Sequence, residues 1–303
     1  MRTSLIAYLS LLRWPNLLMI AGGTLLMLEG GARISGGGGL AGLPLAHVLL
    51  APLCLMLIAA WGYVLNDVFD VATDQTNQRR RPLAEGRIGI PAATTMSRVL
   101  LLLALGALSA SALWLPLPAT LILFLALLLT WSYSPLLQRI PLAALFTVAL
   151  LVSFTVVLPV LLIQQQPGLS PAATQALHSF LVVYGLFALL TTLTREQAKD
   201  LADLSGDQAT GKRSLAVWLG WKIATRVLLF SLVFVFALTA VIALSLWEAG
   251  MHNVLFVGVV FVAVPLGMSV RLALLMQDRG DAATLSATLK WIMVAGLLTA
   301  LFI

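Results

Sequence analysis

Two short segments, residues 66–74 and 199–207, hold acidic side chains in a repeated arrangement. Each contains three aspartates at relative positions 0, +3 and +7. The six aspartates are Asp67, Asp70 and Asp74 in "NDVFDVATD", and Asp200, Asp203 and Asp207 in "KDLADLSGD". The first segment directly follows an apolar run at 49–65. Ionisable groups at the edge of hydrocarbon cost free energy, so they commonly mark a functional site. The repeat therefore indicates a functional site built from both segments.

This spacing favours a metal ion. On an α-helix, positions 0, +3 and +7 lie within one narrow stripe, so each segment aims three carboxylates the same way. Ionised carboxylates this close repel one another, and a divalent cation removes the conflict. Mg²⁺ suits hard oxygen ligands and commonly completes its coordination with substrate phosphates. The flanking bases, which suit a diphosphate, are Arg81, Arg139, Lys199, Lys212 and Arg213.

The composition indicates an integral membrane protein. The 303 residues are 60% hydrophobic and 10% charged, with a mean hydropathy of +1.01, whereas soluble domains carry about 25% charged residues. This leaves little room for a soluble domain, so we expect a single membrane domain over residues 1–303. The net charge of +6 is scattered along loops, which favours lipid or phosphate partners over nucleic acid. The single cysteine, Cys54, excludes an internal disulfide and a multi-cysteine metal site.

The apolar runs predict an all-α bundle, since helices are the plausible spans for runs this long. We expect nine transmembrane helices around a central cavity that opens to the cytoplasmic side, each with about 20 apolar residues. Their expected ranges are 4–28, 45–65, 94–114, 117–134, 142–163, 173–194, 224–246, 254–276 and 284–303.

The basic residues orient this bundle, because positive charge concentrates in cytoplasmic loops. The odd-numbered connections carry only Arg33, and the even-numbered ones carry Arg79, Arg80, Arg81, Arg87, Arg139, Arg195, Lys199, Lys212, Arg213, Lys222, Arg226 and Arg279. We therefore expect a multi-pass protein of the cell membrane with a cytoplasmic N-terminus, an outer C-terminus and both aspartate segments at the cytoplasmic face. The motifs follow the second and sixth helices, so duplication of a four-helix unit is a hypothesis.

The residues around both segments resemble a known family. "NDVFDVATDQTNQRRRPLAEGRI" at 66–88 and "REQAKDLADLSGDQATGKRSLAV" at 195–217 resemble the two signatures of the UbiA superfamily of intramembrane prenyltransferases. "RWPN" at 13–16 and "YSPLLQR" at 133–139 are supporting matches. The longer pattern RExxKDxxDxxGD looks closest to the branch that makes digeranylgeranylglyceryl phosphate. The 4-hydroxybenzoate branch instead carries DTxYAxxDxxDD, which this chain lacks.

This resemblance implies Mg²⁺-dependent transfer of a prenyl group from a prenyl diphosphate, here geranylgeranyl diphosphate, to an acceptor similar to geranylgeranylglyceryl phosphate. The implied metal and diphosphate ligands are Asn66, Asp67, Asp70, Asp74, Asp203 and Asp207. The expected substrate-binding residues are Arg13, Asn16, Asn66, Arg81, Ser134, Arg139, Lys199, Asp200 and Lys212. The expected catalytic residues are Asp67, Asp70, Asp203 and Tyr133, whose ring could stabilise a cation-like allylic carbon.

Two alternatives stay open on the sequence alone. An aromatic acceptor, as in quinone or chlorophyll-type pathways, would use the same donor chemistry. A cation-coupled transporter could also have duplicated halves and acidic sites, although such sites usually lie near the midplane on broken helices. Glu196 and Asp200 are candidates for a general base, and Lys290 is the deepest membrane charge and is worth testing. Prenyl length and oligomeric state are left unassigned.

Overall fold

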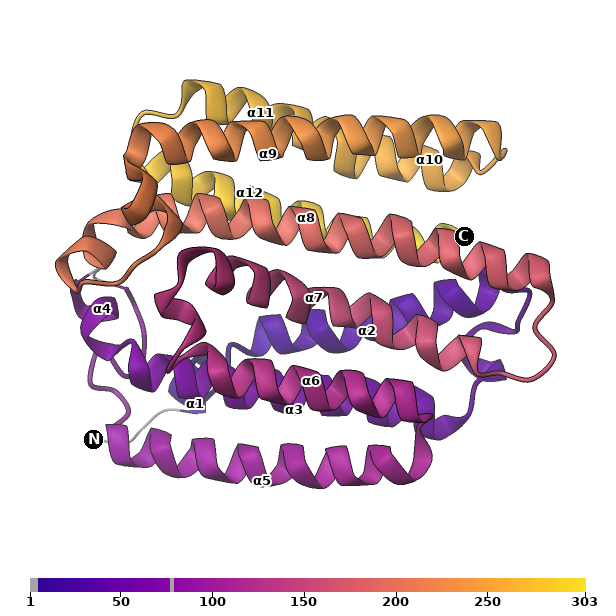
Figure 1. The fold of residues 1–303 in the computed structure, drawn as a ribbon, viewed down its shortest axis with the longest axis horizontal. Helices are drawn as coiled ribbons and strands as arrows, with labels where there is room; N and C mark the ends of the chain where they lie inside the picture. Colours follow the sequence, from indigo (N-terminus) through magenta and orange to yellow (C-terminus); the bar gives the residue numbers. More distant parts are fainter. Residues whose placement is uncertain (1–4, 77–78) are drawn as a thin grey trace.

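In the computed structural model, which describes residues 5–76 and 79–303, the chain forms a bundle of long helices (Figure 1). Within these ranges, eight helical stretches are long and apolar enough to cross a membrane, and a shorter apolar helix, α6, joins them. The all-α membrane fold is confirmed, and the count of nine spans stays a prediction. The helices of the bundle are α2 (Trp14–Ile34), α3 (Leu45–Phe69), α5 (Ile90–Trp114), α6 (Leu117–Tyr133), α7 (Pro141–Gln164), α8 (Pro171–Ala209), α9 (Leu215–Glu248), α10 and α11 with the π-turn between them (His252–Gly258, Val259–Ala263, Val264–Leu275) and α12 (Arg279–Leu298).

Helix α8 holds the two halves of the bundle together. It packs against α7 on one side and against α9 and α12 on the other. One apolar core lies among α2, α3, α5, α6 and α7, and a second lies among α8, α9, α11 and α12. A smaller cluster that includes Met27, Val156 and Tyr184 joins the two cores. The bundle is therefore one packed body with α8 near its middle (Figure 1).

Both aspartate segments lie at the same end of the bundle, the left end in Figure 1, which we call the aspartate end. It contains α1 (Leu5–Leu11), α4 (Val71–Thr76) and the connection from α8 to α9. The carboxyl end of the chain lies at the opposite end. The short helix α4 contacts α8 directly, so packing brings together two segments that are far apart in the sequence.

The expectation of one continuous first helix over 4–28 is wrong. Helix α1 ends at Leu11 and α2 begins at Trp14, because Arg13 adopts a left-handed conformation with φ 53° and ψ 48°. Pro15 follows in the first turn of α2, where its missing N–H would have no helical partner in any case. The break places the Arg13 side chain at the aspartate end.

The first aspartate segment also departs from a continuous helix. Helix α3 ends at Phe69, Asp70 caps it with φ −96° and ψ 9°, and α4 resumes at Val71. The contact of α4 with α8 fixes this change of direction. The second segment is helical as predicted, since Asp200, Asp203 and Asp207 all lie within α8, which extends well past the expected range of 173–194.

Gly62 allows α3 and α6 to approach closely one turn before Asn66. A Cβ placed on Gly62 would lie 2.5 Å from Cγ2 of Thr130, whereas a Cβ on Gly106 in α5 would meet nothing within 4 Å. We expect Gly62→Val to destabilise the fold by about 1–3 kcal/mol through overpacking, and Gly106→Val to have little effect. Thermal unfolding of both variants in lipid tests this, and an equal midpoint for the two would contradict it.

Candidate active site

The last turn of α3 holds a buried cluster around Asp67. This residue is only 1% exposed, and its carboxylate pairs with the guanidinium of Arg13. The same guanidinium lies 4.8 Å from the ring centroid of Tyr63. One oxygen of Asp67 is buried without a hydrogen-bond partner in the described part of the chain. Since a buried, unpaired carboxylate oxygen is costly, the cluster is suited to receive a further positive group.

Asp70 continues this cluster toward α8. Asn66 Nδ2 donates a hydrogen bond of 2.8 Å to Oδ2 of Asp70. The same oxygen lies 3.8 Å from Nζ of Lys212, which follows the end of α8. Gly211 makes this approach possible because it adopts φ +71°, a conformation that glycine alone adopts readily. The backbone N–H of Lys212 then bonds to the carbonyl of Asp207 at 2.9 Å, which fixes the lysine between the two segments.

Arg79 bridges the two aspartate segments directly. Its guanidinium lies 3.3 Å from Oδ1 of Asp74, and it also pairs with the carboxylate of Asp203. The hydroxyls of Thr73 and Thr210 add a contact of 3.3 Å between α4 and the end of α8. The two segments therefore form a single site in which cations lie between carboxylates.

Burial and neighbouring charges shift the pKa values of four groups of the site that lie outside the spanning helices. Burial raises the pKa of Asp74 above its ordinary value, although Arg79 and Arg81 oppose the shift. Burial also works against the charged forms of Arg79 and Lys212, but neighbouring aspartates more than offset it, so both pKa values are raised. Burial and the charge of Arg13 lower the pKa of Arg81. Both bridging cations consequently stay protonated at neutral pH.

A cleft of about 340 Å³ adjoins this site between α8, α12 and the chain at 79–81. Its lining contains five cations and a single carboxylate. The lining residues are Arg79, Arg81, Arg195, Lys199, Ala202, Asp203, Ala283, Ser286, Ala287 and Lys290. Such a surplus of positive charge favours an anionic ligand.

The sequence over residues 17–294 matches the model of the UbiA prenyltransferase family. The chain belongs to this family. Among its relatives, digeranylgeranylglyceryl phosphate synthase of Sulfolobus acidocaldarius is 32% identical over 189 residues, which cover 60% of this chain and 62% of that protein. The enzyme of the same name from Methanothermobacter thermautotrophicus is 29% identical over 244 residues, which cover 80% of each chain.

Solved structures show the same fold. A structure of digeranylgeranylglyceryl phosphate synthase in membranes covers 100% of both chains, with a TM-score of 0.66 and 22% identity. A UbiA homologue from Archaeoglobus fulgidus, bound to GPP and Mg²⁺, covers 97% of this chain and 99% of its own, with a TM-score of 0.60 and 15% identity. The helical bundle described above is thus the UbiA fold.

Several residues expected to bind substrate lie at the aspartate end of this UbiA-family chain. Oδ1 of Asn16 accepts a hydrogen bond of 2.7 Å from Nζ of Lys290, which joins α2 to α12. Lys199 donates to Glu196 at 2.9 Å and lines the cationic cleft with Arg81. These positions are consistent with substrate binding by Asn16, Lys199 and Arg81, which stays a prediction.

Four other residues that were expected to bind substrate or act in catalysis have structural contacts or exposed positions instead. Oδ2 of Asp200 accepts a hydrogen bond of 3.1 Å from the backbone N–H of Leu215, so this carboxylate caps the start of α9. Tyr133 ends α6, and Ser134 caps that helix and is buried. Arg139 is exposed and forms no ion pair with the residues that the structure describes. Their roles in substrate binding or catalysis stay predictions.

Sequence reasoning missed Arg79. Positive charge in a cytoplasmic loop explained the run at 79–81, and only Arg81 was expected to bind substrate. The structure instead places Arg79 between Asp74 and Asp203. Its closeness in sequence to Asp74 was the available signal, but Arg80 and Arg81 follow it directly and lie almost as close.

The oxygen donors of this site fit Mg²⁺ shared with a phosphate. Within residues 5–76 and 79–303, no three His, Cys, Asp or Glu side chains gather as a ready cage for a metal. Mg²⁺ does not require one, because it is usually held by one or two carboxylates together with water and substrate phosphates. The unpartnered oxygen of Asp67 is a suitable donor, and Asp70, Asp74, Asp203 and Asp207 supply others of the same kind.

Proposed function

We propose that this chain is a Mg²⁺-dependent enzyme that transfers a prenyl group from geranylgeranyl diphosphate to an acceptor of the geranylgeranylglyceryl phosphate type. The observation that carries this proposal is the meeting of the two aspartate segments at one end of a membrane bundle, bridged by Arg79. Oxygen ligands and fixed cations in one place suit a metal-bound diphosphate. The family membership supports prenyl transfer as the reaction.

Two observations support the acceptor. The relatives from Sulfolobus and Methanothermobacter both carry the name digeranylgeranylglyceryl phosphate synthase. The cationic cleft beside the aspartates suits an acceptor that carries its own phosphate. An aromatic acceptor would use the same donor site, so an assay with different acceptors must decide between them.

The side chains divide the work of the reaction. Asp67, Asp70 and Asp203 would hold the metal, and Arg79 and Lys212 would bind the diphosphate oxygens by charge-assisted hydrogen bonds. When bound, Mg²⁺ supplies neutralisation of the charge that builds on the leaving diphosphate. The ring of Tyr133 would face the electron-poor allylic carbon. The acceptor oxygen then forms its bond to that carbon, diphosphate leaves, and the hydroxyl proton passes to a base.

The proposal includes the placement of the site relative to the membrane. The chain is a multi-pass integral membrane protein, and residues 1–303 would act as a single domain. The bases around the aspartate end favour a cytoplasmic placement of that end, with the N-terminus inside and the C-terminus outside. A cytoplasmic site would meet soluble Mg²⁺ and diphosphate, while the prenyl chains stay among apolar helices.

An acceptor panel tests the proposed function. Purified protein in lipid receives Mg²⁺ and geranylgeranyl diphosphate with one of three acceptors: geranylgeranylglyceryl phosphate, 4-hydroxybenzoate or dihydroxynaphthoate. Mass spectrometry then detects the prenylated product, and matched wells contain a chelator. We expect product only with the glycerol phosphate lipid and none with the chelator. Product only from an aromatic acid would overturn the acceptor, and product that survives chelation would overturn the metal role.

A further inference from the structure

Two glycines with positive φ bound the connection from α8 to α9. Gly211, just after the end of α8, has φ +71°, and Gly220, inside α9, has φ 72° and ψ 160°. Essentially only glycine adopts the second combination, which separates a short first turn of α9 at 215–219 from the long helix that follows. A Cβ on either glycine would meet nothing within 4 Å, so backbone conformation, and not close packing, requires them. We call residues 211–220 the α8–α9 strap.

The first turn of α9, which lies within the strap, begins without a cap of its own. Ser214 is its N-cap residue, but the serine hydroxyl accepts no hydrogen bond from the turn. The first N–H groups of a helix have no partners within that helix. A helical turn as short as 215–219 is also marginal unless contacts from elsewhere support it. The turn therefore depends on a group outside the strap.

Asp200 on α8 supplies this group. Its Oδ2 accepts a hydrogen bond of 3.1 Å from the backbone N–H of Leu215, and a carboxylate is favourable at the positive end of a helix. The neighbouring Lys199 pairs with Glu196 instead of with Asp200. The contact of Asp200 with the strap is therefore that of a helix cap.

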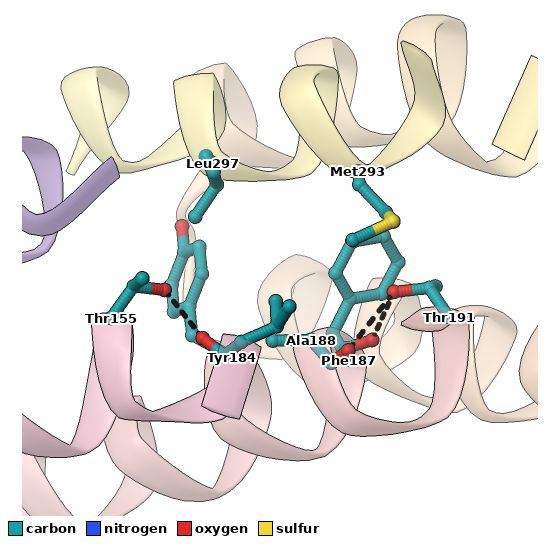
Figure 2. A pocket seen from close by; sticks show the side chains of 8 residues that line it. Thr155, Tyr184, Phe187, Ala188, Thr191, Met293 and Leu297 are labelled. Carbon is teal, nitrogen blue, oxygen red and sulfur yellow. Dashed lines mark hydrogen bonds between the residues drawn. The ribbon is translucent and has the colours of Figure 1, made fainter. Parts of the chain in front are cut away.

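Asp200 differs in this respect from the polar side chains of α8 further inside the bundle. Thr191 donates its hydroxyl to the carbonyl of Phe187 at 2.5 Å, beside the small cavity in Figure 2. Thr192 and Thr194 also donate to carbonyls four residues earlier. These hydroxyls are satisfied within α8, whereas the hydrogen bond of Asp200 reaches the start of the next helix. The bond of Asp200 therefore fixes the strap relative to α8.

The strap carries Lys212, the lysine that lies between the two aspartate segments. Its Nζ lies 3.8 Å from Oδ2 of Asp70. Its backbone N–H donates to the carbonyl of Asp207 at 2.9 Å, and three residues later Leu215 donates to Asp200. The backbone around Lys212 is thus held to α8 on both sides, which limits where this long, flexible side chain can reach.

We propose that Asp200 is a positioning residue, which caps the strap at Leu215 and so holds Lys212 at the diphosphate site without binding metal or substrate itself. The inference rests on the proposed function for the role of Lys212, whereas the cap does not depend on it. A cap requires an oxygen that accepts a hydrogen bond, and asparagine caps helices about as well as aspartate. Asp200→Asn therefore keeps what Asp200→Ala removes.

Tryptic cleavage after Lys212 and Arg213 tests the cap without any need for activity, because cleavage requires the strap to open locally. Full-length protein in lipid is treated with trypsin, and the fragments are measured by mass. Loss of a cap predicts strap cleavage about twofold to thirtyfold faster in Asp200→Ala, and Asp200→Asn is expected to match wild type. Cleavage after Arg87, which is exposed in another loop, is the internal control. Equal strap cleavage in Asp200→Ala and wild type would overturn the proposal.

Donor kinetics test whether the cap acts through Lys212. Asp200→Ala is expected to raise KM for geranylgeranyl diphosphate about threefold to tenfold, within the size of a lost cap, and to leave KM for the acceptor unchanged. Asp200→Asn is expected to restore the donor KM. In a Lys212→Met background, Asp200→Ala should raise the donor KM no further. Equal losses in Asp200→Asn and Asp200→Ala, or additive effects with Lys212→Met, would contradict the positioning role.

Two substitutions at Leu215 test the same hydrogen bond from its other side, and they serve even if Asp200→Ala does not fold. Leu215→Pro removes the bonded N–H at the first helical position, where proline is tolerated, and the extended backbone of Ser214 suits a following proline. Leu215→Ala keeps the N–H and is the matched control. Only Leu215→Pro is expected to raise the donor KM, and equal values for the two would count against the cap. If wild type shows no turnover, the proposed function fails, and strap cleavage alone decides whether Asp200 caps the strap.

Discussion

Asp203→Ala is expected to lower turnover by about a hundredfold to a thousandfold, the range seen when a group that stabilises transition-state charge is removed. Asp203 is the carboxylate through which α8 meets Arg79. Its loss removes a proposed metal ligand and leaves Arg79 with Asp74 as its remaining ion-pair partner among the described residues. Product formation in lipid at saturating donor and acceptor measures the effect.

Glu248→Ala is the matched control for Asp203→Ala. Glu248 ends α9, is exposed, and lies far from the aspartate end. It should keep wild-type turnover. Both variants should unfold at temperatures close to wild type, since Asp203 lies at the partly exposed end of α8. Near-wild-type turnover of Asp203→Ala would mean that the metal site has been placed wrongly.

Arg79→Gln is expected to lower turnover by about tenfold to a hundredfold, whereas Arg80→Gln in the same arginine run should change it little. Arg79 bridges Asp74 and Asp203, so its loss removes one of the links between the two segments and a cation of the proposed diphosphate site. The expected size reflects the loss of charged hydrogen bonds. Arg80 is exposed and pairs with none of the described carboxylates, so charge in the loop is nearly the same in both variants.

The comparison of Arg79→Gln with Arg80→Gln also separates a specific role of Arg79 from the general effect of positive charge in the loop. If positive charge in the loop mattered only for membrane orientation, Arg79→Gln and Arg80→Gln would lose equal amounts of activity. Turnover of each variant at varied donor concentration gives the answer. A rise in donor KM confined to Arg79→Gln would agree with diphosphate binding, and equal kinetics for the two would contradict it.

The sequence predicted structure that neighbouring residues determine, but not structure that depends on packing between distant helices. The helical stripe with Asp203 and Asp207 was predictable because residues 199–209 continue an apolar helix without a proline. The turn at Asp70 was not, because its backbone leaves the helix where α4 packs on α8. The break at Arg13 also went unpredicted, although Pro15 followed it. A left-handed arginine persists only where surrounding structure holds it, here through Asp67 and Tyr63.

The pairing of cations with acids could not be predicted from spacing. Which arginine of the run at 79–81 bridges the segments depends on the path of the loop, and three neighbours of one type give no distinction. The contact of Lys290 with Asn16 joins residues 274 positions apart. Lys290 stood out as the deepest membrane charge, but packing of α12 against α2 supplied its partner.

The central claim is that the two aspartate segments together perform a metal-dependent prenyl transfer. Its most direct test measures pyrophosphate and prenylated lipid in the same reaction, with wild-type protein in lipid, geranylgeranyl diphosphate, geranylgeranylglyceryl phosphate and a Mg²⁺ titration. We predict that both products form in equal amounts, rise together with Mg²⁺, and vanish together in Asp70→Ala and in Asp203→Ala. Equal product formation without Mg²⁺, or in either variant, would contradict the claim.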